Sequence, residues 1–228
     1  MYTPPMFKPD RAASLAFAET RGFGLVCAWD GKRPIASSLP FYLTSAADGT
    51  PRAAFHVARH NPLVKLADGT TSWLLAASGA DAYVSPDWYV SPDQVPTWLY
   101  QVVHLTGTVR KLSDDELAVQ VDTLSDKFEN RLAPKKPWTS SKMTAARLEA
   151  LKRAIVGLVM TVEDVEGSFK LNQHKSDADY TAIGDALASQ TGAGAQVIAG
   201  LMRDARPQAF AADALQNDQM IAAERNAL

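Results

Sequence analysis

The sequence lacks the features that mark secreted and membrane proteins. Its one cysteine, Cys27, lies in the apolar run 23–29 and has no partner in the chain with which to form a disulfide. No apolar run reaches the ~18 residues of a membrane span, and no basic segment followed by an apolar stretch opens the chain. A lone cysteine is typical of a reducing compartment. The sequence therefore predicts a cytoplasmic protein with no membrane segment.

The sequence also lacks an excess of basic charge. Twenty-three Lys and Arg stand against 25 Asp and Glu, which gives a formal net charge of −2. Such a chain has no general positive field that would attract nucleic acid. Basic residues gather only at 135–136 and 147–153, and no helix-turn-helix pattern is present. Direct nucleic-acid binding is therefore not supported by the sequence.

Several catalytic and cofactor motifs are missing as well. There is no glycine-rich G-x-G-x-x-G loop and no G-x-S-x-G elbow, so a triad built from Ser37, His56 or His104 and an aspartate has no local support. His56 and His60 have the i, i+4 spacing of a helical zinc site, but they sit at a strand end with no Cys or Glu pattern beside them. We expect no metal site and identify no catalytic residue.

What the chain does contain is typical of a globular α+β protein. Of its 228 residues, 46% are apolar and 21% charged, enough for a sizeable core, and one domain is the default at this length. Short strands separated by turns predict an antiparallel barrel. The strands are expected at 23–29, 33–43, 72–78, 81–85, 97–111 and 155–163, with one more between the turn at 48–51 and Asn61.

Helices are predicted around these strands. Ser113 and Glu116 form a capping box for a helix that runs to about Asn130, and its apolar stripe should cover one end of the barrel. A turn is expected at 166–167. Further helices are expected at 10–19, 61–67 and 143–153, from 176 onward, and at 196–204, while the tail past Pro207 shows no clear pattern.

The stretch 54–63 combines a strand with the start of a helix. Asn61 is a good N-cap and Pro62 suits the first helical position, so free N–H groups should be exposed there. Arg59 adds a planar set of donors that matches phosphate, and His56 and His60 can also donate. The stretch is consistent with a phosphate site. It is equally consistent with an ordinary surface helix and an ordinary Arg59 ion pair.

The second predicted strand is interrupted by Pro34 and Pro40, which indicates a sheet edge or a bulge. An edge strand has backbone groups free to contact a ligand, and Ser37 and Ser38 add two hydroxyls. Simple protection of the edge explains the prolines equally well.

Five segments of the chain carry a recognisable pattern in a fixed order. They are Ala36-Ser37-Ser38-Leu39-Pro40, the stretch 54–63, Tyr83-Val84-Ser85-Pro86-Asp87-Trp88-Tyr89, Val95-Pro96-Thr97-Trp98-Leu99-Tyr100 and Gly167-Ser168-Phe169-Lys170-Leu171-Asn172-Gln173. Together they resemble the PaiB-like family of FMN-binding split-barrel proteins, and the resemblance extends over roughly residues 1–185. It implies a mainly β, α+β fold: an FMN-binding split β-barrel with flanking helices in residues 1–185, and an alanine-rich helical extension at 186–228 packed on the same domain.

The resemblance also implies a cofactor, FMN, and residues that would hold it. Trp98 would form a wall beside the flavin ring, although a core tryptophan is the commoner case. Lys170 would lie near the N1–C2 edge of the ring, although an exposed strand lysine is more frequent. The expected cofactor-binding residues are Ser37, Ser38, Leu39, Pro40, His56, Arg59, Asn61, Trp98, Lys170 and Gln173.

The chain departs from the family pattern in four of these segments. Ser38 replaces a histidine, Phe55 a glycine and Leu99 an asparagine, and the family's K-L-S-Q-N reads Lys170-Leu171-Asn172-Gln173-His174. The fold should tolerate these changes, but affinity for FMN is expected to be affected, and Phe55 is a candidate to fill space that a ligand occupies in relatives.

Three functions are compatible with these observations. The first is an FMN-binding split-barrel protein that binds FMN at a homodimer interface. The second is the family's usual label, a negative transcriptional regulator, which without a DNA-binding motif would act indirectly. The third is a flavin-dependent oxidoreductase of the pyridoxamine-phosphate-oxidase-like type with an unknown small-molecule substrate.

Overall fold

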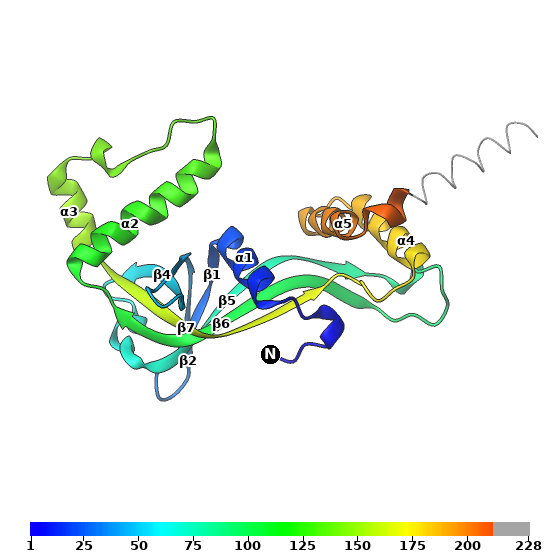
Figure 1. The fold of residues 1–228 in the computed structure, drawn as a ribbon, viewed down its shortest axis with the longest axis horizontal. Coiled ribbons are helices and arrows are strands. Elements are labelled where there is room, and N and C mark those ends of the chain that lie inside the picture. The colour runs from blue at the N-terminus through cyan, green and yellow to red at the C-terminus, as the bar shows by residue number, and fades with distance from the viewer. Residues whose placement is uncertain (212–228) are drawn as a thin grey trace, which may run out of the picture. The chain divides into compact units, whose positions relative to one another are not determined.

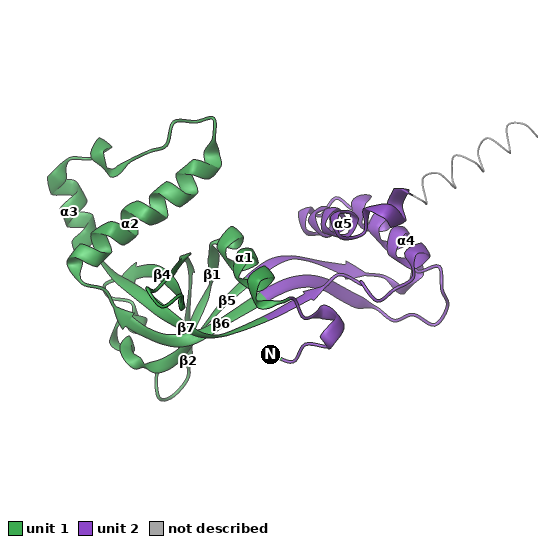
Figure 2. Cartoon of the chain, viewed as in Figure 1, with its two compact units in different colours: residues 1, 10–77, 103–166 green, residues 2–9, 78–102, 167–228 purple. Residues whose placement is uncertain are grey.

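A computed structural model describes residues 1–211 of the chain, which cluster into two compact units (Figure 2). Residues 207–211 are helical, which corrects the unpatterned tail expected past Pro207, and the rest of that tail lies outside the described residues. The domain boundary expected after residue 185 stays a prediction. Unit 1 contains residues 1, 10–77 and 103–166, and unit 2 contains residues 2–9, 78–102 and, of the described residues, 167–211.

The strands form one curled, antiparallel, half-barrel sheet in the order β2-β1-β5-β6-β7-β4-β3 (Figure 1). The predicted split-barrel architecture is therefore confirmed. β2 ends the sheet on one side, as its prolines predicted. The strands are β1 (Phe23–Trp29), β2 (Pro34–Pro40), β3 (Tyr42–Ser45), β4 (Pro51–Ala58), β5 (Asp68–Val84), β6 (Thr97–Lys111) and β7 (Ile155–Lys170).

Five α-helices and several one-turn 3₁₀ helices accompany the strands in the described part of the chain. The α-helices are α1 (Arg11–Arg21), α2 (Asp114–Glu129), α3 (Ala145–Arg153), α4 (Asp177–Ala188) and α5 (Ala193–Ala205). The 3₁₀ helices are η1 (Pro5–Phe7), η2 (Pro62–Lys65), η3 (Pro86–Trp88), η4 (Asn130–Leu132) and η5 (Ser140–Lys142).

Sequence patterning located β6 and α2 well but divided other elements wrongly. The segments expected as separate strands at 72–78 and 81–85 are one strand, β5, and β7 continues through the turn expected at 166–167. Pairing with neighbouring strands outweighs the local turn preference of glycine and serine in these segments. The helix expected at 61–67 is only the one-turn η2.

The caps of α1 and α2 explain why these helices begin and end where the sequence predicts. The Asp10 carboxylate accepts the Ala13 N–H, and Gly22 ends α1 in the left-handed conformation at φ 57°. At α2, Ser113 and Glu116 form the full reciprocal capping box. Leu124 of α2 then packs on Tyr42 of β3, so α2 covers part of the unit 1 sheet.

Unit 2 has its own apolar core, formed where α4 and α5 pack together with the strand ends. Its largest buried side chain is Tyr180, whose hydroxyl donates to the Met202 carbonyl at 3.1 Å. Asp179 is also buried, and its carboxylate accepts the N–H groups of Val90 and Ser91 at 2.9 Å each. Burial alone would raise the pKa of Asp179, but these hydrogen bonds outweigh it and lower that pKa. The 85–91 loop is thereby fixed to α4.

Within unit 1, Gly107 lets β6 lie unusually close to β7. A Cβ at this position would fall 1.8 Å from the Thr161 carbonyl oxygen, which no side-chain movement relieves because the obstacle is backbone. Only glycine fits here, and the sheet depends on it.

We expect Gly107→Ala to destabilise unit 1 by about 1–3 kcal/mol or more, because the strand backbones must separate to admit the methyl group. Urea unfolding followed by circular dichroism measures the loss. Gly200→Ala is the control: its Cβ meets nothing within 4 Å on α5, so the change should be neutral or stabilising. Equal stability of the two variants would contradict the close approach of β6 and β7.

Candidate functional site

The ten predicted cofactor-binding residues fall into two groups, one in each unit. Seven lie in unit 1 and three, Trp98, Lys170 and Gln173, lie in unit 2. The unit 1 group is Ser37, Ser38, Leu39, Pro40, His56, Arg59 and Asn61.

Six of the unit 1 residues line one pocket of about 510 Å³, here called the β2 pocket. This volume is within the range of small-molecule and cofactor sites. β2 forms one side of the pocket and the end of β4 the other. The lining consists of Ser37, Ser38, Leu39, Pro40, His56, Val57, Ala58, Asn61 and Ile155.

Asn61 connects the two sides of the β2 pocket. Its Oδ1 accepts the Leu63 N–H at 3.0 Å, which caps η2, while its Nδ2 donates to Ser37 Oγ at 2.9 Å. The amide thus holds the edge strand β2 against the end of β4. Ser38, which follows Ser37 in β2, is exposed and is also part of the pocket lining.

His56 lines the same pocket. Its Nδ1 is buried and has no hydrogen-bond partner. Burial lowers the pKa of His56, so the ring is neutral near pH 7 and carries one donor and one acceptor. Among the described residues, no group of three or more His, Cys, Asp or Glu is placed to hold a metal ion. His56 therefore adds a polar but uncharged ring to the pocket.

Arg59 follows β4 and is exposed, but part of its guanidinium is already engaged. Its Nε donates to the Arg153 carbonyl at 2.5 Å and its Nη2 to the Ile155 carbonyl at 2.9 Å. These bonds tie the end of β4 to the start of β7 and fix the orientation of the guanidinium. Neither acceptor is a carboxylate, so the positive charge is not neutralised by these contacts.

The short length of η2 changes the argument for a phosphate site. A four-residue 3₁₀ helix has little macrodipole, and the Leu63 N–H is already bonded to Asn61. Any attraction for an anion must therefore come from the Arg59 charge and from the side-chain donors of the pocket.

The donor set of the β2 pocket fits the polyol and phosphate of FMN. Two serine hydroxyls, an amide and a neutral imidazole are present, and none of the nine described residues that line the pocket is acidic. A carboxylate there would repel a phosphate dianion. The apolar remainder, Leu39, Val57, Ala58 and Ile155, suits a flat ring.

In unit 2, Trp98 is not a core residue. Its side chain is 53% exposed and meets Tyr83 edge to face, with ring centroids 5.9 Å apart. The alternative of a buried tryptophan is therefore wrong. Two exposed aromatic rings side by side form an apolar surface that suits a flat ligand or a protein partner.

Lys170 and Gln173 have different surroundings from those expected. Lys170 is half-buried and donates to Thr97 Oγ1 at 2.6 Å. Gln173 uses both ends of its amide within its own turn: Oε1 accepts the Leu171 N–H at 2.7 Å and Nε2 donates to the Phe169 carbonyl at 2.6 Å. Gln173 therefore shapes the turn that follows β7, and its contact with a flavin stays a prediction.

The structure also places the positions that depart from the family pattern. Phe55 is fully buried in β4 and is not among the described residues that line the β2 pocket, so it does not fill ligand space there. Leu99 is fully buried in the unit 2 core. Ser38 remains at the β2 pocket, and His174 is exposed beside a second pocket.

This second pocket, here called the lysine pocket, has a volume of about 420 Å³ and lies wholly in unit 2. Lys170, His174 and Lys175 provide its positive groups, and Phe7 and Tyr89 provide aromatic surface. Sequence reasoning missed Lys175 and Tyr89 here, because residues 80 or more positions apart meet in the pocket and no local pattern links them.

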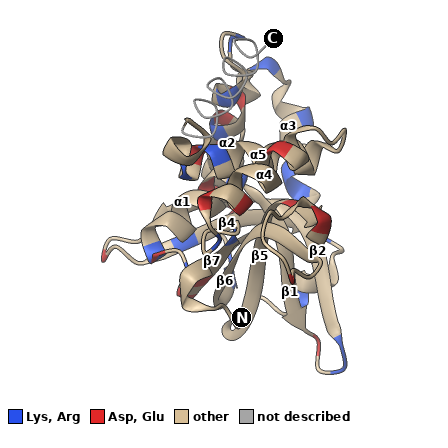
Figure 3. Cartoon of the chain, turned by 90° about the vertical axis from the view of Figure 1, so that its right-hand side faces the viewer, with Lys and Arg blue, Asp and Glu red and all other residues tan. Residues whose placement is uncertain are grey.

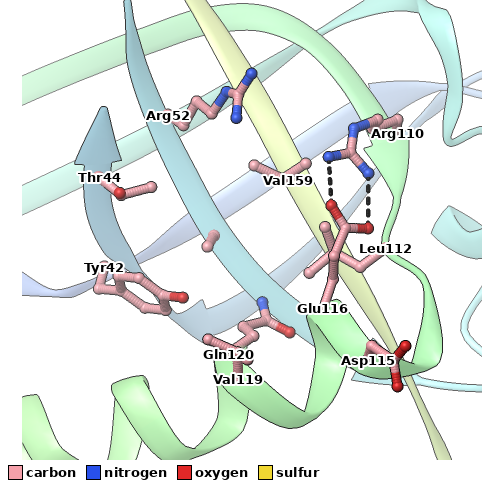
Figure 4. Close-up of a pocket in the computed structure, with 11 residues that line it drawn as sticks. Tyr42, Thr44, Arg52, Arg110, Leu112, Asp115, Glu116, Val119, Gln120 and Val159 are labelled. Carbon is pink, nitrogen blue, oxygen red and sulfur yellow. Dashed lines mark hydrogen bonds and ion pairs between the residues drawn. The ribbon is translucent and has the colours of Figure 1, made fainter. Parts of the chain in front are cut away.

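A third pocket, of about 370 Å³, lies between α2 and the unit 1 sheet (Figure 4). Arg110 donates to both Glu116 oxygens, at 2.8 and 3.1 Å. Hydrogen bonds from Arg110 and from the Ser113 N–H lower the pKa of Glu116 to about 2. The charges of this pair neutralise each other, and none of the predicted cofactor residues lines this pocket.

The charge distribution agrees with the small net charge. Figure 3 shows acidic and basic residues interspersed over the helices and strands of the visible face.

No helix of the described chain is both long and apolar enough to cross a membrane.

Comparison with known proteins gives the same fold and cofactor class. The chain is 32% identical over 205 residues to "Protease synthase and sporulation protein PAI 2" of Bacillus subtilis, an alignment that covers 90% of this chain and 97% of the relative.

Two solved structures share the fold at low identity. The FAD and heme binding protein of Mycobacterium smegmatis gives a TM-score of 0.52 at 16% identity, covering 76% of this chain and 78% of that one. The flavocytochrome Anf3 of Azotobacter vinelandii gives 0.50 at 14% identity, covering 71% and 67%. Residues 1–164 match the model of the family described as "Putative FMN-binding domain", so the chain belongs to this family of FMN-binding split-barrel proteins.

Proposed function

We propose that this protein binds FMN at a homodimer interface, with the phosphate and polyol in the β2 pocket. The observation that carries the proposal is the convergence of six expected cofactor residues on one pocket, whose lining, among the described residues, includes no acidic side chain. These residues come from β2, from β4 and from the segment before η2, which are separate in the sequence. Their meeting in one pocket is therefore a result of the fold and not of closeness along the chain.

Each side chain has a defined part in this proposal. The Ser37 and Ser38 hydroxyls and the neutral His56 ring bond the polyol, and the Arg59 charge faces the phosphate. Asn61 keeps the edge strand β2 in place by its bond to Ser37. Trp98, Lys170 and Gln173 are proposed to contact the isoalloxazine ring in the assembled dimer. FMN, when bound, supplies electron or hydride transfer.

The homodimer is supported by apolar side chains that the single chain leaves exposed. In unit 1, Phe23, Leu25 and Trp29 alternate along β1 and are 47%, 42% and 55% exposed. Residues two apart on a strand share a face, so the three form one apolar stripe. A soluble monomer seldom exposes such a stripe, whereas homodimer interfaces are rich in apolar and aromatic residues.

Regulation of transcription, the usual family label, is proposed only as an indirect role. Basic residues 147, 152 and 153 lie on the nine-residue α3, and Lys152 is already paired with Glu149. The remaining charge is small for a nucleic-acid surface.

The alternative of a flavin-dependent oxidoreductase is tested by bleaching of the flavin absorbance with NADH or NADPH.

We expect Arg59→Ala to weaken FMN binding by about 1.5–3 kcal/mol, because a charge-assisted contact to the phosphate is lost. Riboflavin, which lacks the phosphate, should bind almost equally to both proteins. Isothermal titration of the two ligands makes the comparison. Arg59→Lys should restore part of the affinity, since an ammonium lacks the planar fork.

Arg33→Ala is the matched control, because Arg33 has a 79% exposed side chain and lies outside the β2 pocket. Equal losses for FMN and riboflavin in Arg59→Ala would show instead that Arg59 acts only through its bonds to the Arg153 and Ile155 carbonyls.

Trp98→Ala should weaken flavin binding by about 1–2 kcal/mol if the indole borders the ring. Because the side chain is 53% exposed, the melting temperature should change little. Leu132→Ala is the control, because it removes an equally exposed apolar side chain of unit 1, also 53% exposed, that lies outside the β1 stripe and the β2 pocket; it should leave flavin affinity unchanged. Unchanged flavin affinity in Trp98→Ala would remove Trp98 from the site.

The protein should sediment as a dimer at micromolar concentration. Leu25→Glu places a charge in the apolar stripe of β1 and should shift the equilibrium toward monomer while leaving the buried core untouched. Analytical ultracentrifugation measures both. A wild-type protein that sediments only as monomer would contradict the proposed interface.

A further inference from the structure

We propose that the lysine pocket is a separate binding site for a small organic anion with a flat apolar body, such as an aromatic carboxylate or an aryl phosphate. Of its three positive groups, Lys170 is also a proposed flavin contact, whereas His174 and Lys175 are not, and the β2 pocket has no part in it. The inference therefore stands on the geometry of unit 2 alone.

The positive charges of this pocket are not neutralised within it. Lys170 donates to a hydroxyl, Thr97 Oγ1, at 2.6 Å, and Lys175 donates to an amide, Gln94 Oε1, at 2.7 Å. Both lysines are half-buried, and none of the eleven described residues that line the pocket is acidic. Two ammonium groups held by neutral acceptors in a pocket whose described lining has one sign of charge create a positive potential that attracts an anion.

Two acidic residues of α4, the helix that follows the turn after β7, are engaged elsewhere. The Asp179 carboxylate accepts hydrogen bonds from the Val90 N–H and from the N–H and hydroxyl of Ser91, and Asp177 pairs with Arg206 at 3.0 Å. The pair Arg110–Glu116 in unit 1 shows the contrast, since the charges there cancel within their own pocket.

The titration of His174 agrees with this positive potential. Its pKa is lowered by burial and, in addition, by the charges of Lys175 and Lys170. The groups around it are therefore net positive, and an anion that binds between them should raise the pKa of His174.

The apolar part of the pocket favours a flat ligand. Lys175 Nζ lies 4.9 Å from the centre of the Tyr89 ring, and Phe7 meets the His174 ring edge to face at 5.4 Å. Met6 and Val95 add apolar surface at the rim and are both more than half exposed. A ring of the ligand can lie against these groups while its charged end meets the lysines.

The turn that presents these side chains is rigid before any ligand arrives. Asn172 takes the left-handed conformation at φ 58°, is 1% exposed, and donates to the Tyr89 hydroxyl at 3.3 Å. Gln173 bonds both sides of the turn, to Leu171 and Phe169. A preformed arrangement of this kind lowers the entropy cost of binding.

Isothermal titration with benzoate, phenyl phosphate and benzamide tests the proposal on the full-length protein. Both anions should bind, and benzamide, a neutral molecule of the same shape as benzoate, should bind at least 10-fold more weakly. Stronger binding of benzoate or of phenyl phosphate tells whether the site prefers a carboxylate or a phosphate. Benzamide binding as tightly as benzoate would overturn the proposal.

Lys175→Gln should weaken anion binding roughly 10-fold or more and leave the affinity for FMN unchanged. Lys32→Gln is the matched control, because Lys32 is an exposed lysine in the Asp30–Gly31 hairpin of unit 1. If Lys175→Gln leaves the affinity for the anions unchanged, the proposed anion site is wrong. If benzoate displaces FMN, the anion and the flavin do not bind at separate sites.

A second readout does not depend on FMN. The C2–H resonance of His174, identified by its loss in His174→Asn, should titrate at a higher pH when phenyl phosphate is present. An unshifted titration at saturating phenyl phosphate would contradict binding beside His174. Failure of FMN to bind would affect the proposed function only and leave this test intact.

Discussion

The close approach of β6 and β7 at Gly107 is the constraint on which unit 1 depends. The Thr161 carbonyl oxygen would lie 1.8 Å from a Cβ at this position, so the two backbones can approach in this way only with glycine at 107. β7 in turn pairs with β4 through Ala58↔Ile155, and β4 carries His56 and ends at Arg59. The Arg59 bonds to the Arg153 and Ile155 carbonyls then fasten this end of β4. The position of the β2 pocket thus follows from a backbone contact far from it in sequence.

Charge compensation distinguishes the three pockets more clearly than their size does. In the pocket under α2, Arg110 and Glu116 pair with each other, whereas the β2 pocket has Arg59 as a cation beside its neutral donors. The described lining of the lysine pocket has positive and neutral groups and no acidic one. The charges of the last two pockets suit the anionic ligands proposed for them, a polyol phosphate and a small organic anion.

Local signals explain which parts of the fold the sequence could predict. The capping box at Ser113 and the β-branched run of β6 are complete within a few residues, so both elements were located closely. The extents of β5 and β7 depend on pairing partners elsewhere in the chain, and a glycine or serine was mistaken for a turn. The six residues of the β2 pocket were identified through the family resemblance. The engagement of Gln173 in its own turn, and of Arg59 with two carbonyls, depends on three-dimensional contacts that no spacing reveals.

The turn after β7 separates residues that shape the backbone from residues that face a ligand. Asn172 and Gln173 hold the chain, one by its left-handed conformation and the other by two backbone hydrogen bonds. Lys170, His174 and Lys175 do not contribute to that backbone geometry through their side chains. Changes at these three positions therefore leave both of these restraints on the backbone in place. The histidine that replaces the family's asparagine at 174 is a change of this kind, which makes this turn a place where members of one family can diverge in ligand preference while keeping a common scaffold.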